Sequence, residues 1–255
     1  MPYTFAHIGY VLPIKKEWKQ YFSITGLVFG SLAPDCDILF RLTKIRFHIF
    51  QYDIKTIFLI LFPIALISAF CFHVFCRNVI IENLPRKFEL KYQKYNTFNF
   101  LQHFKQHYFI VSASILFAIL FHLFLDFLCH CLNAYSVKMI LLELTNNNII
   151  ANLSYIFSIY GLPIIFSLVG FYMIFVYEYH KNISIKDFAI TTQKFTFWIS
   201  MFLITILFSV LKFYITEIDN EFFIDSIIIS LTSSFLVAIY ATCMLYYFIQ
   251  KFKTI

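Results

Sequence analysis

Charged residues are scarce in this sequence, making up only 13% of its 255 residues. Soluble globular domains carry about 25%, and half that fraction cannot cover a folded chain of this length with polar groups. Glycine is also scarce, with 5 residues, whereas 60% of the chain is hydrophobic and 21% is aromatic. This composition excludes an ordinary cytosolic enzyme, a disordered chain and a secreted disulfide scaffold. It predicts an integral membrane protein, with the lipid bilayer as its main partner.

Several motifs that are typical of soluble enzymes and binding proteins are missing. The sequence has no glycine-rich phosphate loop, no GxSxG nucleophile motif, no nucleic-acid-binding module and no CxxC pair. Its six cysteines lie mostly in or beside apolar runs, which predicts reduced core residues. The net charge of +6 comes from lysines and arginines in loops next to apolar runs. The positive-inside rule explains this pattern better than nucleic acid does.

Six apolar segments are candidate membrane spans, each of which needs about 20 residues. We therefore predict an all-α fold, a polytopic membrane helix bundle of about six transmembrane helices with short interfacial helices. Residues 135–145 are too short to span and are expected to lie along the membrane surface. Gly26 and Gly30 form a GxxxG pattern in the first span, a signal of close helix packing. The predicted spans are residues 21–40, 54–76, 108–132, 150–177, 195–215 and 223–249.

The distribution of basic residues orients these spans. Lysines and arginines gather in the loop 77–107, in the loop after the fourth span and in the C-terminal tail. We therefore expect a multi-pass protein of the inner, cytoplasmic membrane with both termini on the cytoplasmic side. The basic residues Arg41, Lys44 and Arg46 oppose this orientation, because it leaves them outside.

The third span holds most of the ionisable residues that lie within a span. His122, Asp126 and His130 are spaced four residues apart, so they share one helical face within an arc of about 80°. Buried ionisable groups are costly unless they are paired, which makes this face a functional candidate. Three interpretations remain open: half of a metal site, a hydrogen bond from Asp126 that joins helices, or a proton path.

A second group of acids follows the first span, in the segment Pro34-Asp35-Cys36-Asp37. Pro34 disfavours helical backbone at Ala33, so we expect the helix to break there. Two carboxylates two residues apart repel each other, and a cation between them would offset the repulsion. Alternatively, Pro34 opens a new helix whose first turn favours Asp35 and Asp37 through its dipole. The predicted topology brings this segment and the third-span face to similar depth, which predicts a shared pocket.

The remaining histidines carry weaker signals. His7 and His48 are each either an ordinary interfacial histidine or a ligand. His103 and His107 are spaced for a metal site on one helix, but we expect them to contact lipid headgroups. His73 lies between two cysteines and is expected to be a core residue rather than a member of a Cys/His site. The fourth to sixth spans hold almost no polar groups that would suit a transport path.

The order of these residues resembles a family of uncharacterised bacterial membrane proteins. Members of that family read like MPFTxxH at the N-terminus, followed by a GSxAPD segment, a histidine before the next span and an HxxxDxxTH helix. That family is in turn similar to the membrane-bound metal-dependent hydrolases. The resemblance covers roughly residues 1–180, which are predicted to form a membrane domain carrying the His/Asp cluster. Residues 181–255 would then add two transmembrane helices.

The resemblance implies a divalent metal held by a cluster of histidines and aspartates. This chain departs from the family pattern at Leu125, Cys129 and Ile49. None of these departures removes an implied ligand, although residues that orient ligands differ. The implied ligands are His7, Asp35, Asp37, His48, His122, Asp126 and His130.

Three functions are consistent with the sequence. The first is a metal-dependent hydrolase with Zn²⁺, or else Mn²⁺ or Mg²⁺, and with Asp37 or Asp126 as general base. Its substrate would be a lipid-like ester or phosphoester that enters from the bilayer. The second is a metal or proton transporter, which predicts polar groups across the whole membrane depth. The third is a non-catalytic membrane scaffold with a structural polar cluster.

Overall fold

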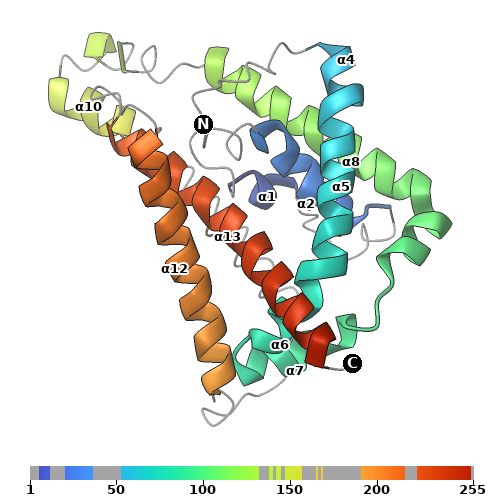
Figure 1. The fold of residues 1–255 in the computed structure, drawn as a ribbon. Helices are drawn as coiled ribbons and strands as arrows, with labels where there is room; N and C mark the ends of the chain where they lie inside the picture. Colours follow the sequence, from blue (N-terminus) through green and yellow to red (C-terminus); the bar gives the residue numbers. More distant parts are fainter. Residues whose placement is uncertain are drawn as a thin grey trace. The chain divides into compact units, whose positions relative to one another are not determined.

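The computed structural model of the chain consists of helices (Figure 1). No strand occurs within the described ranges, which confirms the predicted all-α class. The described residues are 6–11, 21–36, 53–131, 138–139, 142–144, 147–156, 165, 168, 191–215 and 223–253.

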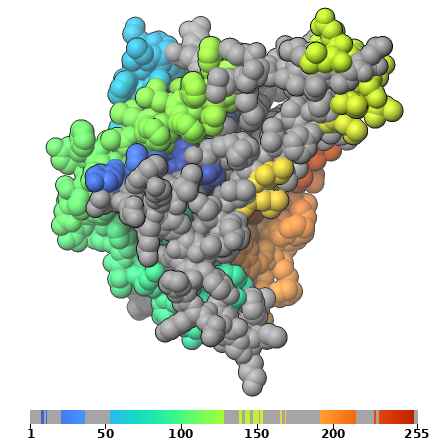
Figure 2. All heavy atoms as spheres, turned by 180° about the vertical axis from the view of Figure 1, so that it is seen from behind, coloured from blue at the N-terminus to red at the C-terminus, as the bar shows by residue number. Residues whose placement is uncertain are grey.

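Four of the described helices are long and apolar enough to cross a membrane, so the chain is a helical membrane protein. They comprise Ile54–Asn83, Phe100–Phe127, Thr192–Tyr214 and Ser230–Phe252. Many of their large apolar side chains are exposed, as expected for surfaces that face lipid. In Figure 2, the green atoms of one of these helices, α8 (Phe100–Cys131), are visible at the surface of the face shown.

These four helices confirm the second, third, fifth and sixth predicted spans. In place of the first, the described residues contain the shorter apolar helix Ile24–Cys36. The predicted fourth span lies largely outside the described residues, which include the helix α10 (Asn148–Ile156) at its start. Most of the predicted interfacial helix, residues 135–145, also lies outside them, although residues 138–139 and 142–144 are helical.

The second span is helical beyond its predicted end at residue 76. It consists of α4 (Ile54–Thr56), the π-helix η3 (Ile57–Leu61), α5 (Phe62–Cys71), the π-helix η4 (Phe72–Cys76) and α6 (Arg77–Asn83). The prediction ended the span at Arg77 because of its charge, but the guanidinium hydrogen-bonds to carbonyl oxygens of residues 96 and 98. Pro63 lies two residues after the end of η3, where wider helical bonding compensates for the amide hydrogen that proline lacks.

The third span also begins earlier than predicted, at Phe100 rather than at residue 108. The side chain of Asn99 starts the helix by accepting a hydrogen bond from the Gln102 amide at 3.1 Å. The backbone leaves helical geometry at His107, with φ −128° and ψ 31°. The predicted start at residue 108 therefore coincides with a kink inside a longer helix.

The chain divides into two compact units. The first comprises Met1–Pro34, Phe50–Leu66 and Phe109–Tyr179, and the second comprises Asp35–Ile49, Ile67–Tyr108 and His180–Ile255. In the first unit, α1 (Ala6–Val11) and α2 (Ile24–Leu32) pack with α8 around Val11, Leu27 and Ala118. In the second, a core of Cys76, Val79, Phe197 and Cys243 joins η4 and α6 to the last two spans.

The last two spans, α12 (Thr192–Ile215) and α13 (Phe223–Lys253), lie side by side within the second unit (Figure 1). Their interface is more polar than the sequence suggested, since it buries several hydroxyl groups and one lysine. The Nζ atom of Lys212 lies 3.4 Å from Ser233 Oγ. Small hydroxyl residues allow membrane helices to approach closely, so we assign this seam to packing. Apart from Lys194, the buried polar residues of these two helices are Thr205, Ser209, Lys212, Ser230, Ser233, Ser234 and Thr242.

A nearly buried ion pair ties α12 to the helix α7 (Arg86–Tyr92). The Lys194 ammonium donates hydrogen bonds to the Leu84 carbonyl oxygen at 2.7 Å and to the Glu89 carboxylate. Burial alone would raise the pKa of Glu89, but hydrogen bonds and charge from Lys194 and Arg86 outweigh it and lower that pKa below its ordinary value. The Trp198 indole adds a hydrogen bond to the Asn83 carbonyl oxygen at 2.8 Å.

Candidate metal centre

Two glycines bring α2 into close contact with α8 in the first unit. A Cβ atom added at Gly30 would lie 2.5 Å from the Ile115 carbonyl oxygen and 2.9 Å from Ala118 Cβ. At Gly26 the added atom would lie 2.8 Å from the Val111 carbonyl oxygen. All three distances are shorter than the contacts that real Cβ atoms make, so these positions require glycine. The GxxxG pattern is therefore confirmed as a helix-packing motif.

This close approach allows hydrogen bonds between the two helices. The backbone amide of Ser23 donates to Ser114 Oγ at 2.8 Å. Ala118 faces Gly30, and His122 follows one helical turn later on α8. Its Nδ1 atom lies 2.7 Å from the Ser31 carbonyl oxygen. Because a carbonyl oxygen only accepts hydrogen bonds, Nδ1 must carry the proton. The imidazole of His122 is thus fixed in orientation and in tautomer, with only 1% of its side chain exposed.

The other ring nitrogen of His122 faces Asp126. Nε2 lies 3.3 Å from Asp126 Oδ2, and the carboxylate side chain is 24% exposed. With Nδ1 protonated, Nε2 of the neutral imidazole is an acceptor, as is the carboxylate oxygen. Two facing acceptors need a proton or a metal ion between them. The prediction that residues 122 and 126 meet on one helical face is confirmed, and we call them the His122–Asp126 pair.

The geometry of the His122–Asp126 pair fits a divalent metal. Zinc binds imidazole nitrogen and carboxylate oxygen at about 2.0–2.2 Å in a tetrahedral arrangement, so two such ligand atoms lie about 3.3–3.5 Å apart. The observed separation of Nε2 and Oδ2 is 3.3 Å. Metal-binding histidines also typically donate their second N–H to a carbonyl or carboxylate. The hydrogen bond to Ser31 satisfies this condition.

The other implied ligands are less well described. His7 lies in α1 and His130 in α8, where the backbone but not the side chain is described, and Asp37 and His48 lie outside the described residues. Asp35 is half-buried in the second unit. Within the described part of the chain, no three His, Cys, Asp or Glu side chains are grouped closely enough to hold a metal ion. The ligand set beyond the His122–Asp126 pair therefore stays a prediction.

The backbone around Asp35 differs from the predicted helix break. The helix α2 ends at Leu32, but Ala33 keeps helical angles of φ −61° and ψ −40°. The chain continues as a 3₁₀ turn, η2 (Ala33–Cys36). A change to the tighter 3₁₀ bonding pattern accommodates Pro34 without extended backbone at Ala33. Asp35 therefore lies at the C-terminal end of the continuous helix Ile24–Cys36, where the helix dipole does not favour an acid.

Three other histidines in the described residues, His73, His103 and His107, make contacts with neighbouring rings. The His73 ring stacks on Phe100, with ring centroids 4.4 Å apart, but His73 is half-buried and lines a pocket rather than the core that was expected for it. The His103 and His107 rings lie 4.8 Å apart. The contact between His73 and Arg77 was not predicted, although the spacing of four residues between them could have indicated it.

Comparison with known proteins gives a family without an assigned activity. Residues 1–245 match the model of a family described as "Domain of unknown function (DUF4184)". The match extends through α12 and most of α13, beyond the residues that the sequence resemblance covered. No curated protein and no solved structure matches the chain. Because the match covers nearly the whole sequence, the chain belongs to the DUF4184 family.

Proposed function

We propose that the protein is a metal-dependent membrane hydrolase that cleaves an ester or phosphoester bond in a lipid-like substrate. The arrangement of His122 carries this proposal. Its Nδ1 proton is held by the Ser31 carbonyl oxygen, and its Nε2 atom is directed at Asp126 at a separation that suits a divalent ion.

The His122–Asp126 pair supplies two ligands in this proposal. His7, Asp35, His48 and His130 are the candidates for the others, with Zn²⁺ as the first choice and Mn²⁺ or Mg²⁺ as alternatives. A divalent ion supplies Lewis-acid chemistry, because it polarises the scissile bond and acidifies water. Asp37 is then the general base, since Asp126 already faces the imidazole as a ligand.

The surroundings of Asp126 favour a substrate that comes from the bilayer. Asp126 is partly exposed, and its neighbours Phe124 and Phe127 on α8 are 53% and 58% exposed. A partly exposed polar group on a helix that also exposes aromatic side chains is accessible to amphipathic molecules. An ester or phosphoester at the junction of a lipid headgroup and its acyl chains would reach such a site.

Metal analysis of the detergent-purified protein tests the proposal. Wild type is expected to carry about one divalent ion per chain, and Asp126→Asn and Asp35→Ala are expected to lose it. Asp126→Asn keeps the size of the side chain and a hydrogen bond to His122, so it removes a metal ligand without removing the helix contact. Asp53→Asn, which changes the N-terminal cap of α4 only, is the matched control and should keep the ion.

Hydrolysis of fluorogenic lipid esters and phosphoesters by the metal-loaded protein then distinguishes an enzyme from the other functions. A stoichiometric ion with no turnover of either substrate class would favour the scaffold. Metal or proton flux in proteoliposomes that is lost in His122→Ala would favour the transporter. Wild type without stoichiometric metal, together with unchanged stability in Asp126→Asn, would contradict a metal centre altogether.

A further inference from the structure

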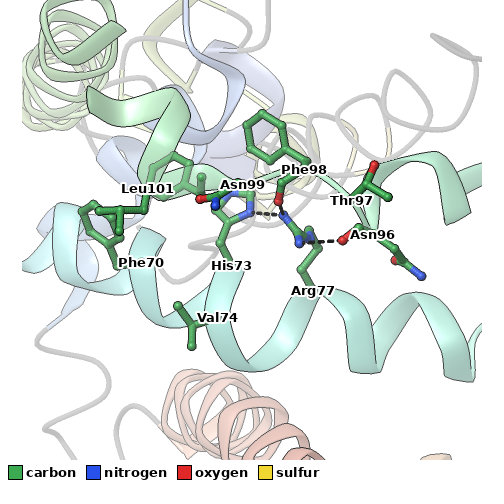
Figure 3. A pocket seen from close by; sticks show the side chains of 10 residues that line it. Phe70, His73, Val74, Arg77, Asn96, Thr97, Phe98, Asn99 and Leu101 are labelled. Atoms are coloured by element: carbon green, nitrogen blue, oxygen red, sulfur yellow. Dashed lines mark hydrogen bonds between the residues drawn. The ribbon is translucent and has the colours of Figure 1, made fainter. Parts of the chain in front are cut away.

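The second unit contains a basic pocket where the second span meets the start of the third (Figure 3). Its volume is about 330 Å³, large enough for a phosphate group and part of the molecule that carries it. The pocket lies between η4 and the first residue of α6 on one side and the chain segment 96–101 on the other. Its lining residues are Phe70, His73, Val74, Arg77, Asn96, Thr97, Phe98, Asn99, Phe100 and Leu101.

Arg77 gives the pocket its charge. Its guanidinium donates hydrogen bonds to the carbonyl oxygens of Phe98 and Asn96 and, through Nε, to Asn78 Oδ1 at 2.9 Å. Its Nη1 atom also lies 3.3 Å from His73 Nδ1. All these partners are neutral acceptors that hold the guanidinium in place without balancing its charge. No aspartate or glutamate is among the described residues that line the pocket.

The start of α8 adds a second positive feature to the pocket. Phe100 and Leu101 are the first two residues of this 32-residue helix, and both line the pocket. The first amides of a helix have no partner within the helix, and the dipole there favours an anion. The Asn99 side chain caps only the Gln102 amide among the described contacts. The pocket therefore combines a fixed guanidinium with a helix N-terminus.

The backbone of η4 is typical of a functional site. The π-helical segment Phe72–Cys76 contains His73 and directly precedes Arg77. π-helical segments are rare, and single π-helical turns within α-helices are frequently found at functional sites. Here the segment directs His73 and Arg77 towards the same loop (Figure 3).

The position of the pocket along the helices points to the level of the lipid headgroups. The second span, Ile54–Asn83, has 30 residues and would be about 45 Å long, whereas the hydrocarbon core is about 30 Å thick. Arg77 lies in the last quarter of this helix, near the region that exceeds the hydrocarbon. The adjoining segment 86–95 carries Arg86, Lys87, Lys91 and Lys94, as is usual beside a membrane surface.

The two ends of the pocket differ in polarity. Phe70 and Leu101 lie at one end in Figure 3, and the Leu101 side chain is 52% exposed. Arg77, Thr97 and Asn96 lie at the other end. An amphipathic molecule with an anionic group matches this order, whereas a free anion would leave the apolar end unused.

From these observations we propose that the pocket between η4 and segment 96–101 binds the phosphate group of an anionic phospholipid, with Arg77 and the N-terminus of α8 holding the phosphate. The phosphate accepts hydrogen bonds from the guanidinium and from helix amides, and the glycerol and acyl chains extend past Phe70 and Leu101. This site is separate in its residues from the proposed metal centre, and its test does not depend on metal or on hydrolysis.

Native mass spectrometry of the full chain, with phosphatidylglycerol or phosphatidylcholine added, tests the proposal. Thr97→Asp introduces a negative charge at the polar end of the pocket while leaving every contact of Arg77 in place. It is expected to weaken phosphatidylglycerol binding at least about tenfold, whereas Thr97→Asn, of equal size and without charge, should bind like wild type. Arg77→Gln should also lose the lipid, and Lys94→Gln, which removes an exposed cation from the same segment, should keep it.

The outcomes separate the two sources of the phosphate. Binding of phosphatidylglycerol that is lost in Thr97→Asp and Arg77→Gln, with no competition by inorganic phosphate at millimolar concentration, would support a lipid headgroup. Competition by inorganic phosphate without any retained lipid would overturn the lipid assignment in favour of a soluble phosphate. Equal lipid binding by wild type, Thr97→Asp and Thr97→Asn would overturn the anion site itself, even if Arg77→Gln failed to fold.

Discussion

Substitution of Gly30 by alanine is predicted to separate α2 from α8 and to release His122. The new Cβ atom would lie 2.5 Å from the Ile115 carbonyl oxygen, whereas ordinary contact begins near 3.4 Å. The obstructing atom belongs to the helix backbone and cannot rotate away, so the helices must move apart by about 0.9 Å. The same movement lengthens the 2.7 Å contact between His122 Nδ1 and the Ser31 carbonyl oxygen to about 3.6 Å, beyond hydrogen-bonding range.

Two terms contribute to the expected loss of stability. Overpacking of a close contact costs about 1–3 kcal/mol, and an interhelical hydrogen bond in a membrane contributes about 0.6 kcal/mol. Gly30→Ala should therefore lower the free energy of unfolding by about 2–3 kcal/mol. In the proposed account it should also weaken metal binding, because His122 loses the carbonyl that orients it.

Reversible unfolding in mixed micelles, followed by circular dichroism, measures the first effect. Ser31→Ala is the matched control, because it leaves the Ser31 carbonyl oxygen in place and removes only a hydroxyl that bonds back to Val28. This control should lose at most about 1 kcal/mol, the contribution of one hydrogen bond. If Gly30→Ala were as stable as Ser31→Ala, the close approach of α2 and α8 would not hold in the protein.

Further predictions concern the ties between α12 and the end of the second span. Glu89→Gln should lower the melting temperature at neutral pH and reduce the loss of stability on acidification. The reason is that the lowered pKa of folded Glu89 stabilises the protein above the unfolded value near 4.3, and this contribution is lost as the pH falls through the folded pKa. Thermal unfolding between about pH 3 and pH 7 measures both effects. Glu143→Gln, at an exposed position, should leave the dependence of the melting temperature on pH unchanged. A pH dependence for Glu89→Gln that parallels that of wild type would contradict the ion pair. Trp198→Phe should cost about 1 kcal/mol through the lost hydrogen bond to the Asn83 carbonyl oxygen, measurable by the same unfolding assay. No change in that variant would mean that water or another donor satisfies the carbonyl.

Composition and periodicity were sufficient to predict the all-α membrane fold and four of its spans. The ends of the spans were harder to predict, because charge was taken as the limit of a helix. Arg77 and His103 are both inside helices, and Arg77 is accommodated there by carbonyl oxygens of a segment about 20 residues away in the sequence. Such tertiary partners cannot be predicted from the local sequence around Arg77.

In the candidate site, too, local contacts could be predicted from the sequence and tertiary contacts could not. The spacing of His122 and Asp126 predicted that they would meet, because helical geometry alone decides it. The hydrogen bond from His122 to Ser31 depends on how closely Gly30 lets two helices approach, and the residues concerned are 91 positions apart. The basic pocket at Arg77 likewise depends on a π-helical turn and on the start of α8, neither of which periodicity reveals.

X-ray absorption at the metal edge of the purified, metal-loaded protein is the direct test of a metal centre at the His122–Asp126 pair. The account predicts a first shell of nitrogen and oxygen atoms at about 2.0–2.2 Å, with the scattering pattern of imidazole. His122→Ala should show a weaker imidazole contribution or no bound metal, whereas His107→Ala, on the same helix but away from the pair, should match wild type. A shell without imidazole, or a spectrum that is identical in wild type and His122→Ala, would contradict a metal centre at the His122–Asp126 pair.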